Sequence, residues 1–200
     1  MGLQAINKII SDSSAMMKSK GTSSVVLKSK KEAIELMKTY NPSLQVSCGM
    51  YPERCVMGNA PTLAEIRRDY GKEIAIKWLV IELNDFNSFV GVSEERKMDV
   101  KLMQSVSDMI IARYFYLKLS EILLFFQKLK YGEYGEMYGG VDALRIMRAL
   151  KSFIEERNII IDREEKRMRE EKEREEMKNA ITSEEYERRK KERLHLLSGE

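Results

Sequence analysis

One histidine and two cysteines among 200 residues leave few options for metal or nucleophilic chemistry. A structural zinc site uses four nitrogen or sulfur ligands, and His195, Cys48 and Cys55 cannot supply four within one chain. The histidine lies in the charged C-terminal segment, which argues against a Ser–His or Cys–His catalytic pair. A disulfide framework is also disfavoured. We expect reduced thiols in a cytoplasmic protein, and a single bridge between the two cysteines is the alternative.

Long apolar runs and nucleotide-binding motifs are also missing. No stretch of about 18 apolar residues occurs, and residues 1–20 contain no apolar core that would mark a signal peptide. The chain has neither a GxxxxGK(S/T) phosphate loop nor a GxGxxG motif after a strand. We therefore expect no membrane span, no bound cofactor and no enzymatic activity.

Carboxylates are abundant, and two groups of them are close in the sequence. Glu82 lies near Asp85, and Glu94 and Glu95 lie near Asp99. The first pair could reach one metal ion from a helix end. In a chain with 32 acidic residues such groups arise by chance, so we predict no metal site.

Charged residues make up 34% of the sequence and are unevenly distributed. Residues 161–200 hold 12 of the 35 basic and 13 of the 32 acidic side chains, so the folded core should end near Ile161. The net charge of +3 is too small to require a nucleic-acid partner. Residues 1–40 carry seven lysines against three acids. This excess fits either a contact with an anionic surface or a solvated, flexible start.

The apolar pattern predicts a mostly α-helical protein in four parts. They are a flexible segment (1–24), a small segment with a helix and short strands (25–61), a compact core of four to five helices (62–161) and a charged helix or tail (162–200).

Within the second part, apolar periodicity predicts a helix at residues 29–40, which Pro42 would end. Short apolar runs at residues 25–27 and 44–46 are candidate strands. Residues 47–61 contain glycines and prolines and are expected to form a connection.

The core helices follow from apolar residues at steps of three and four. Thr62 and Glu65 form a capping box that opens a helix of about twenty residues, in which Gly71 marks a close crossing or a break. A turn at residues 84–91 follows, with Phe86 and Phe89 pointing inward. Further helices are expected at residues 99–117, at 120–130 with Ser120 as N-cap, and after Asp142 with Leu144, Met147, Leu150, Phe153 and Ile154 on the inner face.

The stretch FFQKLKYGEYGEMYGGVD, residues 125–142, is the most informative part of the chain. It places four glycines and three tyrosines between two helical segments, where a solvated linker would not need aromatic residues. We expect an ordered connection, and such connections often carry function. Tyrosines can stack on bases and basic residues can hold phosphates. The candidate residues for contact with nucleic acid or a protein partner are Lys128, Lys130, Tyr131, Tyr134, Tyr138, Arg145 and Arg148.

A structural interpretation of the same stretch is the one we favour. Tyrosines in a glycine-rich connection can lie flat on the domain and hydrogen-bond through their hydroxyls. Gly132 stands where a glycine commonly ends a helix. Glu133 and Glu136 also reduce the local positive charge, which is unfavourable for a phosphate site.

The C-terminal part alternates acids and bases at spacings that allow (i, i+4) pairs, such as Glu170 with Arg174. Met168 and Met177 are the only apolar residues between residues 162 and 179, so the heptad pattern of a stable coiled coil is missing. We expect a solvated helix, interrupted near residues 180–183, that binds a protein partner.

One block of residues suggests a family. Residues 124–139 read Leu-Phe-Phe-x-Lys-x-Lys-x-Gly-x-Tyr-Gly-x-x-Tyr-Gly, and they follow a capped helix start at Thr62 and precede an Ala149-Leu150-x-x-Phe153 pattern. This arrangement resembles a family of small uncharacterised proteins from Bacteroidales genomes, their prophages and mobile elements, over roughly residues 30–161. The resemblance implies a helical fold and brings no catalytic residues.

A compact helical domain followed by a charged segment is also similar to certain phage helicase loaders, which implies docking on a replicative helicase. From these similarities we expect a non-enzymatic accessory protein in DNA replication or maintenance of a phage or mobile element. One alternative is direct nucleic-acid binding through residues 128–148. The other is an interaction module with no nucleic-acid role. The sequence leaves the oligomeric state open.

Overall fold

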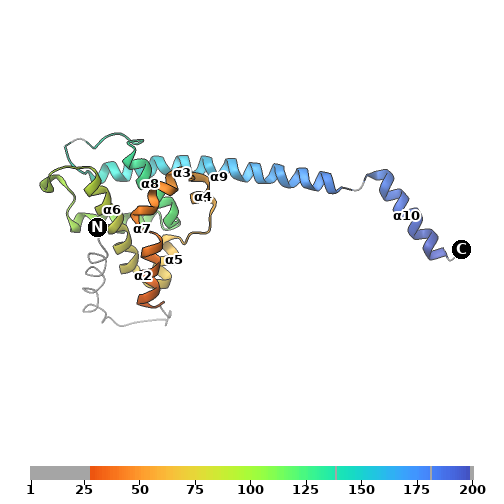
Figure 1. Cartoon of the computed structure of the whole chain (residues 1–200), viewed down its shortest axis with the longest axis horizontal. Helices are drawn as coiled ribbons and strands as arrows, with labels where there is room; N and C mark the ends of the chain where they lie inside the picture. The colour runs from red at the N-terminus through yellow and green to blue at the C-terminus, as the bar shows by residue number, and fades with distance from the viewer. Residues whose placement is uncertain (1–27, 138, 181, 199–200) are drawn as a thin grey trace. The chain divides into compact units, whose positions relative to one another are not determined.

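The computed structural model describes residues 28–137, 139–180 and 182–198, and this part of the chain is mostly α-helical (Figure 1). Within it no β-strand forms, and Thr62 and Lys118 make an isolated antiparallel bridge. The chain divides into two compact units, Met1–Asn158 and Ile159–Glu200. None of the helices in the described part is long and apolar enough to cross a bilayer.

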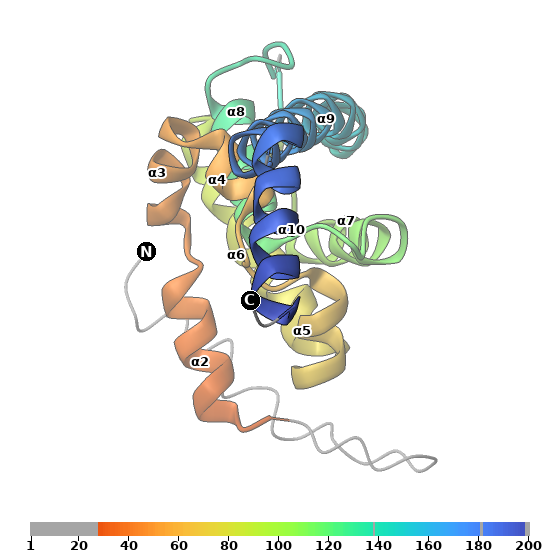
Figure 2. The same cartoon turned by 90° about the vertical axis from the view of Figure 1, so that its right-hand side faces the viewer.

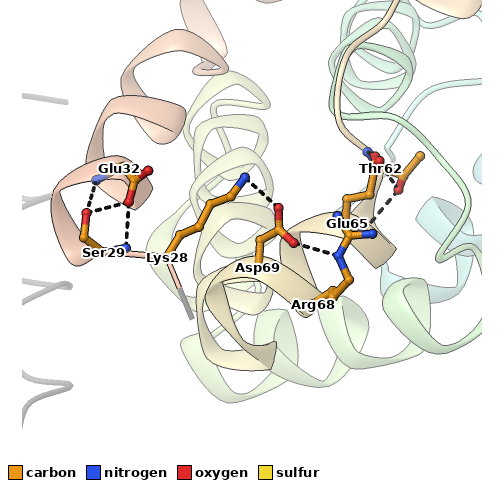
Figure 3. Close-up of polar contacts among 7 residues, drawn as sticks. All are labelled: Lys28, Ser29, Glu32, Thr62, Glu65, Arg68 and Asp69. Atoms are coloured by element: carbon orange, nitrogen blue, oxygen red, sulfur yellow. Dashed lines mark hydrogen bonds and ion pairs between the residues drawn. The ribbon is translucent and has the colours of Figure 1, made fainter. Parts of the chain in front are cut away.

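The first unit contains helices before residue 60 as well as after it. Helix α2 (Lys30–Thr39) begins after Ser29, whose hydroxyl and the Glu32 carboxylate form a capping box (Figure 3). A 3₁₀ turn at Pro42–Leu44 leads into α3 (Gln45–Met50) and α4 (Pro52–Met57). The helix predicted at residues 29–40 is therefore confirmed.

Two predictions for residues 25–61 are wrong, and a third concerns residues that the structure does not describe. Residues 44–46 form no strand, because Leu44 ends the 3₁₀ turn and the next two residues begin α3. The connection predicted at residues 47–61 is helical as far as Met57. Short apolar runs cannot be distinguished as strand or helix by periodicity alone. The strand expected at residues 25–27 lies outside the described residues.

The remaining helices of the first unit are α5 (Leu63–Tyr70), α6 (Lys72–Phe89), α7 (Val100–Arg113), α8 (Leu119–Lys130) and the first part of α9 (Ala143–Asn179). Helix α8 is buried along nearly its whole length, and α3, α4 and α6 lie against it (Figure 2). The prediction of four to five helices is thus too low, because α3 and α4 pack on the same core. Phe125 and Phe126 are fully buried there, together with Trp78 from α6.

Three helix boundaries differ from the predicted ones. Gly71, at φ +89°, breaks the long helix predicted from Thr62 into α5 and α6. Helix α6 then continues through the predicted turn to Phe89, which is 58% exposed, whereas Phe86 is buried as expected. Ser120 does not cap α8, since the helix begins at Leu119 and the Ser120 hydroxyl donates instead to the Cys55 carbonyl.

Helix α5 is fixed at both ends by charged side chains (Figure 3). At its start, the Thr62 hydroxyl and the Glu65 carboxylate form the predicted capping box, with the Thr62 N–H donating to Glu65 at 2.8 Å. At its end, Asp69 accepts from Arg68 at 2.7 Å and pairs with Lys28 at 2.8 Å. These two cations lower the pKa of Asp69 to about 2.

The inner face of α9 is only partly as predicted. Leu150 and Phe153 are buried, but Leu144 is 66% exposed and Ile146 takes the inward position. Asp142 caps the helix as expected, because its carboxylate accepts from the Leu144 N–H at 2.8 Å.

Candidate partner-binding segment

The connection between α8 and α9 begins with a glycine-ended helix terminus. Gly132 has φ +75°, and its N–H donates to the Leu129 carbonyl while the Glu133 N–H donates to the Lys128 carbonyl. These are the two hydrogen bonds of a Schellman motif. The role predicted for Gly132 is confirmed, and the chain leaves α8 in a defined direction.

Tyr134 attaches this connection to the core. Its ring lies 6.1 Å from that of Phe125, and its hydroxyl donates to Glu156 Oε2 on α9 at 3.1 Å. Burial and the nearby Glu156 carboxylate raise the pKa of this hydroxyl. Tyr134 therefore lies on the domain and hydrogen-bonds through its hydroxyl, as the structural interpretation requires.

Lys128 is held between two carboxylates. Its ammonium lies 2.6 Å from Glu133 and 2.9 Å from Glu156, so Glu156 receives hydrogen bonds from both Lys128 and Tyr134. The side chain of Lys128 is only 19% exposed. The cluster ties the end of α8, the connection and α9 together.

Lys130 belongs to a second network, which joins α3, α6 and α8. Its ammonium lies 2.5 Å from Asp85 and 5.4 Å from the ring centre of Phe89. The Gln45 amide donates to Glu82 at 2.7 Å and approaches Asp85 at 3.4 Å. The side chain of Lys130 is 13% exposed, so it is largely withdrawn from solvent.

The carboxyl of Glu82 is completely buried on α6. Burial raises its pKa to about 8, and the hydrogen bond from Gln45 only partly opposes this effect. The sequence placed Glu82 and Asp85 together as possible metal ligands. The two side chains do lie close together, but their neighbours are the Gln45 amide and the Lys130 ammonium group. Within the described residues no three His, Cys, Asp or Glu side chains are grouped so as to hold a metal ion.

The other predicted contact residues have different positions. Tyr131 is 65% exposed and lies beside Gly49 of α3. Arg145 and Arg148 are exposed on α9, and Arg145 donates to the Glu136 carbonyl. Tyr138 lies outside the described residues. The structure thus groups Lys128 and Tyr134 around Glu156, and it holds Lys130 in a separate network.

Sequence reasoning missed the partners of these side chains. Glu156, which binds Lys128 and Tyr134, lies far from both along the chain, and so does Gln45 from Glu82. No local spacing in the sequence points to either partner. A third network, Glu121 with Arg157 at 2.6 Å, was missed for the same reason. Glu121 is completely buried in α8. Glu121 lies within the apolar run of α8, and this position was the one signal in the sequence that could have predicted a buried carboxylate.

The C-terminal unit has a different surface. It contains the end of α9 and helix α10 (Ser183–Ser198). From Asp162 to His195 every side chain that the structure describes is exposed except those of Glu164 and Glu185. Ion pairs between neighbouring turns run along it, such as Lys172 with Glu176 and Arg189 with Glu185.

Fold and site together define a helical protein with a compact, internally ion-paired unit and a charged, solvent-exposed helical unit. Residues 97–195 match the profile of a family of unknown function, DUF6633. No curated protein and no solved structure matches the chain. Similarity to an uncharacterised family is thus confirmed. The matched region contains α7, α8, the connection and most of the C-terminal helices.

Proposed function

We propose that the protein is a non-enzymatic adaptor that binds a protein partner through residues 162–195. The supporting observation is the exposure of nearly every described side chain in this range. A helix that is polar all round buries no apolar face in its own chain. Its (i, i+4) pairs contribute only about 0.2–0.5 kcal/mol each. A partner with a complementary charge pattern would bind such a surface rapidly and selectively.

The biological setting of this adaptor is a further part of the proposal. We place it in DNA replication or maintenance of a Bacteroidales phage or mobile element, with a replicative helicase as the partner. Support comes from the resemblance of residues 30–161 and from the helicase-loader-like order of a compact part and a charged part.

Direct nucleic-acid binding through residues 128–148 has less support. Lys128 and Lys130 are two of the four basic residues in that segment. Both are paired with carboxylates inside the first unit. A phosphate would have to displace these carboxylates. Single-stranded DNA titrated at low salt tests this alternative, and binding that Tyr131→Ala and Arg148→Glu weaken would favour it over the adaptor.

Affinity capture followed by titration with purified helicase tests the adaptor. The full chain should capture the helicase, and a chain ending at Ile161 should lose it while keeping the circular dichroism spectrum of a folded helical protein. Equal capture by both chains would reject residues 162–195 as the binding element.

A full-length pair of variants controls for the truncation. Reversing three exposed charges in the proposed surface (Arg169→Glu, Arg174→Glu and Arg193→Glu) should weaken helicase binding about tenfold or more. Reversing three exposed lysines elsewhere (Lys30→Glu, Lys31→Glu and Lys101→Glu) should not. Equal effects of the two sets would show that net charge, and not this surface, governs the association.

A further inference from the structure

A hollow of about 250 Å³ lies where α3 and α4 meet the start of α8. Its wall includes Cys48 from α3 and Cys55 from α4, together with Tyr40, Arg54 and Ser120. Cys48 is 3% exposed and Cys55 is 7% exposed. Both cysteines of the chain therefore line the hollow while exposing little of their surface to solvent.

The two thiols face each other within this wall. Tyr51 ends α3 and directly precedes Pro52, so α4 starts at once in a new direction. The Cys55 thiol then reaches the Cys48 carbonyl at 3.7 Å. The side chains of Cys48 and Cys55 interact, and this interaction raises the pKa of Cys48 and lowers the pKa of Cys55. The two sulfurs are not joined in this structure.

Hydrogen bonds to α8 hold the cysteine pair in place. The Ser120 hydroxyl donates to the Cys55 carbonyl at 2.7 Å, and the Lys118 ammonium donates to the Val56 carbonyl at 2.7 Å. Both bonds fix the backbone of α4 against the core, on the side where Cys55 faces Cys48. The arrangement is thus built into the fold, and the proposed adaptor surface does not use it.

We propose that Cys48 and Cys55 form a peroxide-reactive dithiol site that closes to an intramolecular disulfide. The Cys55 thiolate attacks one oxygen of hydrogen peroxide, the O–O bond breaks, and the departing hydroxide takes up a proton to become water. The Cys48 sulfur then gives up its proton and attacks the resulting Cys55 sulfenic acid. The S–O bond breaks and a second water leaves. Two thiols are oxidised by two electrons and one peroxide is reduced to two waters.

Peptide mapping of the full chain tests the site without any substitution. The reduced protein is treated with a small excess of hydrogen peroxide, blocked with iodoacetamide and digested with trypsin. Trypsin cleaves after Arg54, so residues 39–54 carry Cys48 and residues 55–67 carry Cys55. We expect these two peptides joined by a disulfide, in protein that remains monomeric on a non-reducing gel. Two alkylated peptides, or a bridge between chains only, would overturn the proposal.

Single variants test the order of the two steps. With Cys48→Ser, Cys55 should stop at the sulfenic acid and react with dimedone. With Cys55→Ser, Cys48 should react on the order of tenfold more slowly. Equal labelling of both variants would overturn the assignment of Cys55 as the attacking residue. If either variant fails to fold, the wild-type peptide map still decides whether the bridge forms. Oxidation of Met50 or Met57 adds mass to these peptides, whereas the bridge removes hydrogen, so the two reactions are distinguished.

Discussion

The side-chain amide of Gln45 donates a 2.7 Å hydrogen bond to Oε2 of Glu82, a carboxyl group that is completely buried. The remaining oxygens of this pair, Oε1 of Gln45 and Oε1 of Glu82, have no hydrogen-bond partner. A proton on Glu82 Oε1 would supply a donor that could satisfy both. The contact links α3 to α6 most favourably when the acid is neutral.

The first prediction concerns the pH dependence of stability. The folded state keeps the Glu82 proton up to a pKa of about 8, whereas the unfolded chain releases it near 4.5. This contribution to the free energy of unfolding is therefore fully present below the lower value. It falls by up to about 1.4 kcal/mol per pH unit as the pH rises, and levels off above the higher value. Urea unfolding between about pH 5 and pH 9 measures this decline.

Matched variants isolate the residue responsible for that decline. Glu82→Gln should remove it, because an amide keeps a donor and an acceptor facing Gln45 and does not titrate. Glu73→Gln changes an exposed glutamate on the same helix and should keep the wild-type slope. A slope that persists in Glu82→Gln would assign the pH dependence to other groups.

The second prediction concerns Arg157, the cationic partner of the buried Glu121. Arg157→Ala should lower the free energy of unfolding by about 3–5 kcal/mol, because it leaves the buried Glu121 carboxylate without its cationic partner. Lys38→Ala breaks the exposed pair with Glu35 and should cost less than about 1 kcal/mol. Denaturant titration measures both losses. If the two variants lost similar amounts of unfolding free energy, water would have to reach Glu121 once Arg157 is replaced, and the prediction would be wrong.

The third prediction separates the two contacts of Tyr134. Tyr134→Phe removes only the hydrogen bond to Glu156 and should cost about 1 kcal/mol. Tyr134→Ala also removes the ring from Phe125 and should cost about 2–4 kcal/mol. Thermal unfolding and amide exchange at residues 132–136 should both register the difference. Unchanged exchange in Tyr134→Ala would show that the ring does not hold the connection.

The fourth prediction concerns Gly132, where no atom lies within 4 Å of an added Cβ. A substitution at Gly132 therefore tests the cost of the left-handed backbone conformation at φ +75°, and not a steric clash with neighbouring atoms. Gly132→Ala should cost about 1–2 kcal/mol, and Gly132→Asn should cost less, since asparagine tolerates the left-handed region better. Equal losses for the two variants in thermal unfolding would contradict this explanation.

Local signals account for the parts of the fold that were predicted correctly. The Thr62 capping box, the glycine end of α8 and the Asp142 cap each depend on partners within a few residues, so the sequence shows them directly. The segment at residues 44–57 was misjudged, because its helices take their buried face from packing on α8.

In the candidate site, too, local features could be predicted from the sequence and long-range contacts could not. Sequence reasoning selected Tyr134, Lys128 and Lys130, but each of them has a carboxylate partner that lies far away in the chain. Glu156 is 22 residues from Tyr134, and Asp85 is 45 residues from Lys130. Sequence reasoning noted that Glu82 and Asp85 could reach one metal ion and predicted no metal site there, but it could not show that their neighbours are Gln45 and Lys130.

By itself, the sequence determined the helical class of the protein, the helix ends set by capping residues, and the polar surface of the C-terminal helices. Each of these follows from side-chain periodicity or from hydrogen bonds between near neighbours. Only the tertiary structure decided which charges are buried, which carboxylate holds each lysine, and that Cys48 faces Cys55. The buried charges and the distant carboxylate partners depend on helices far apart in sequence meeting around α8, where the loss of water makes each unpaired polar group costly. The cysteine contact depends on how α4 starts directly after α3.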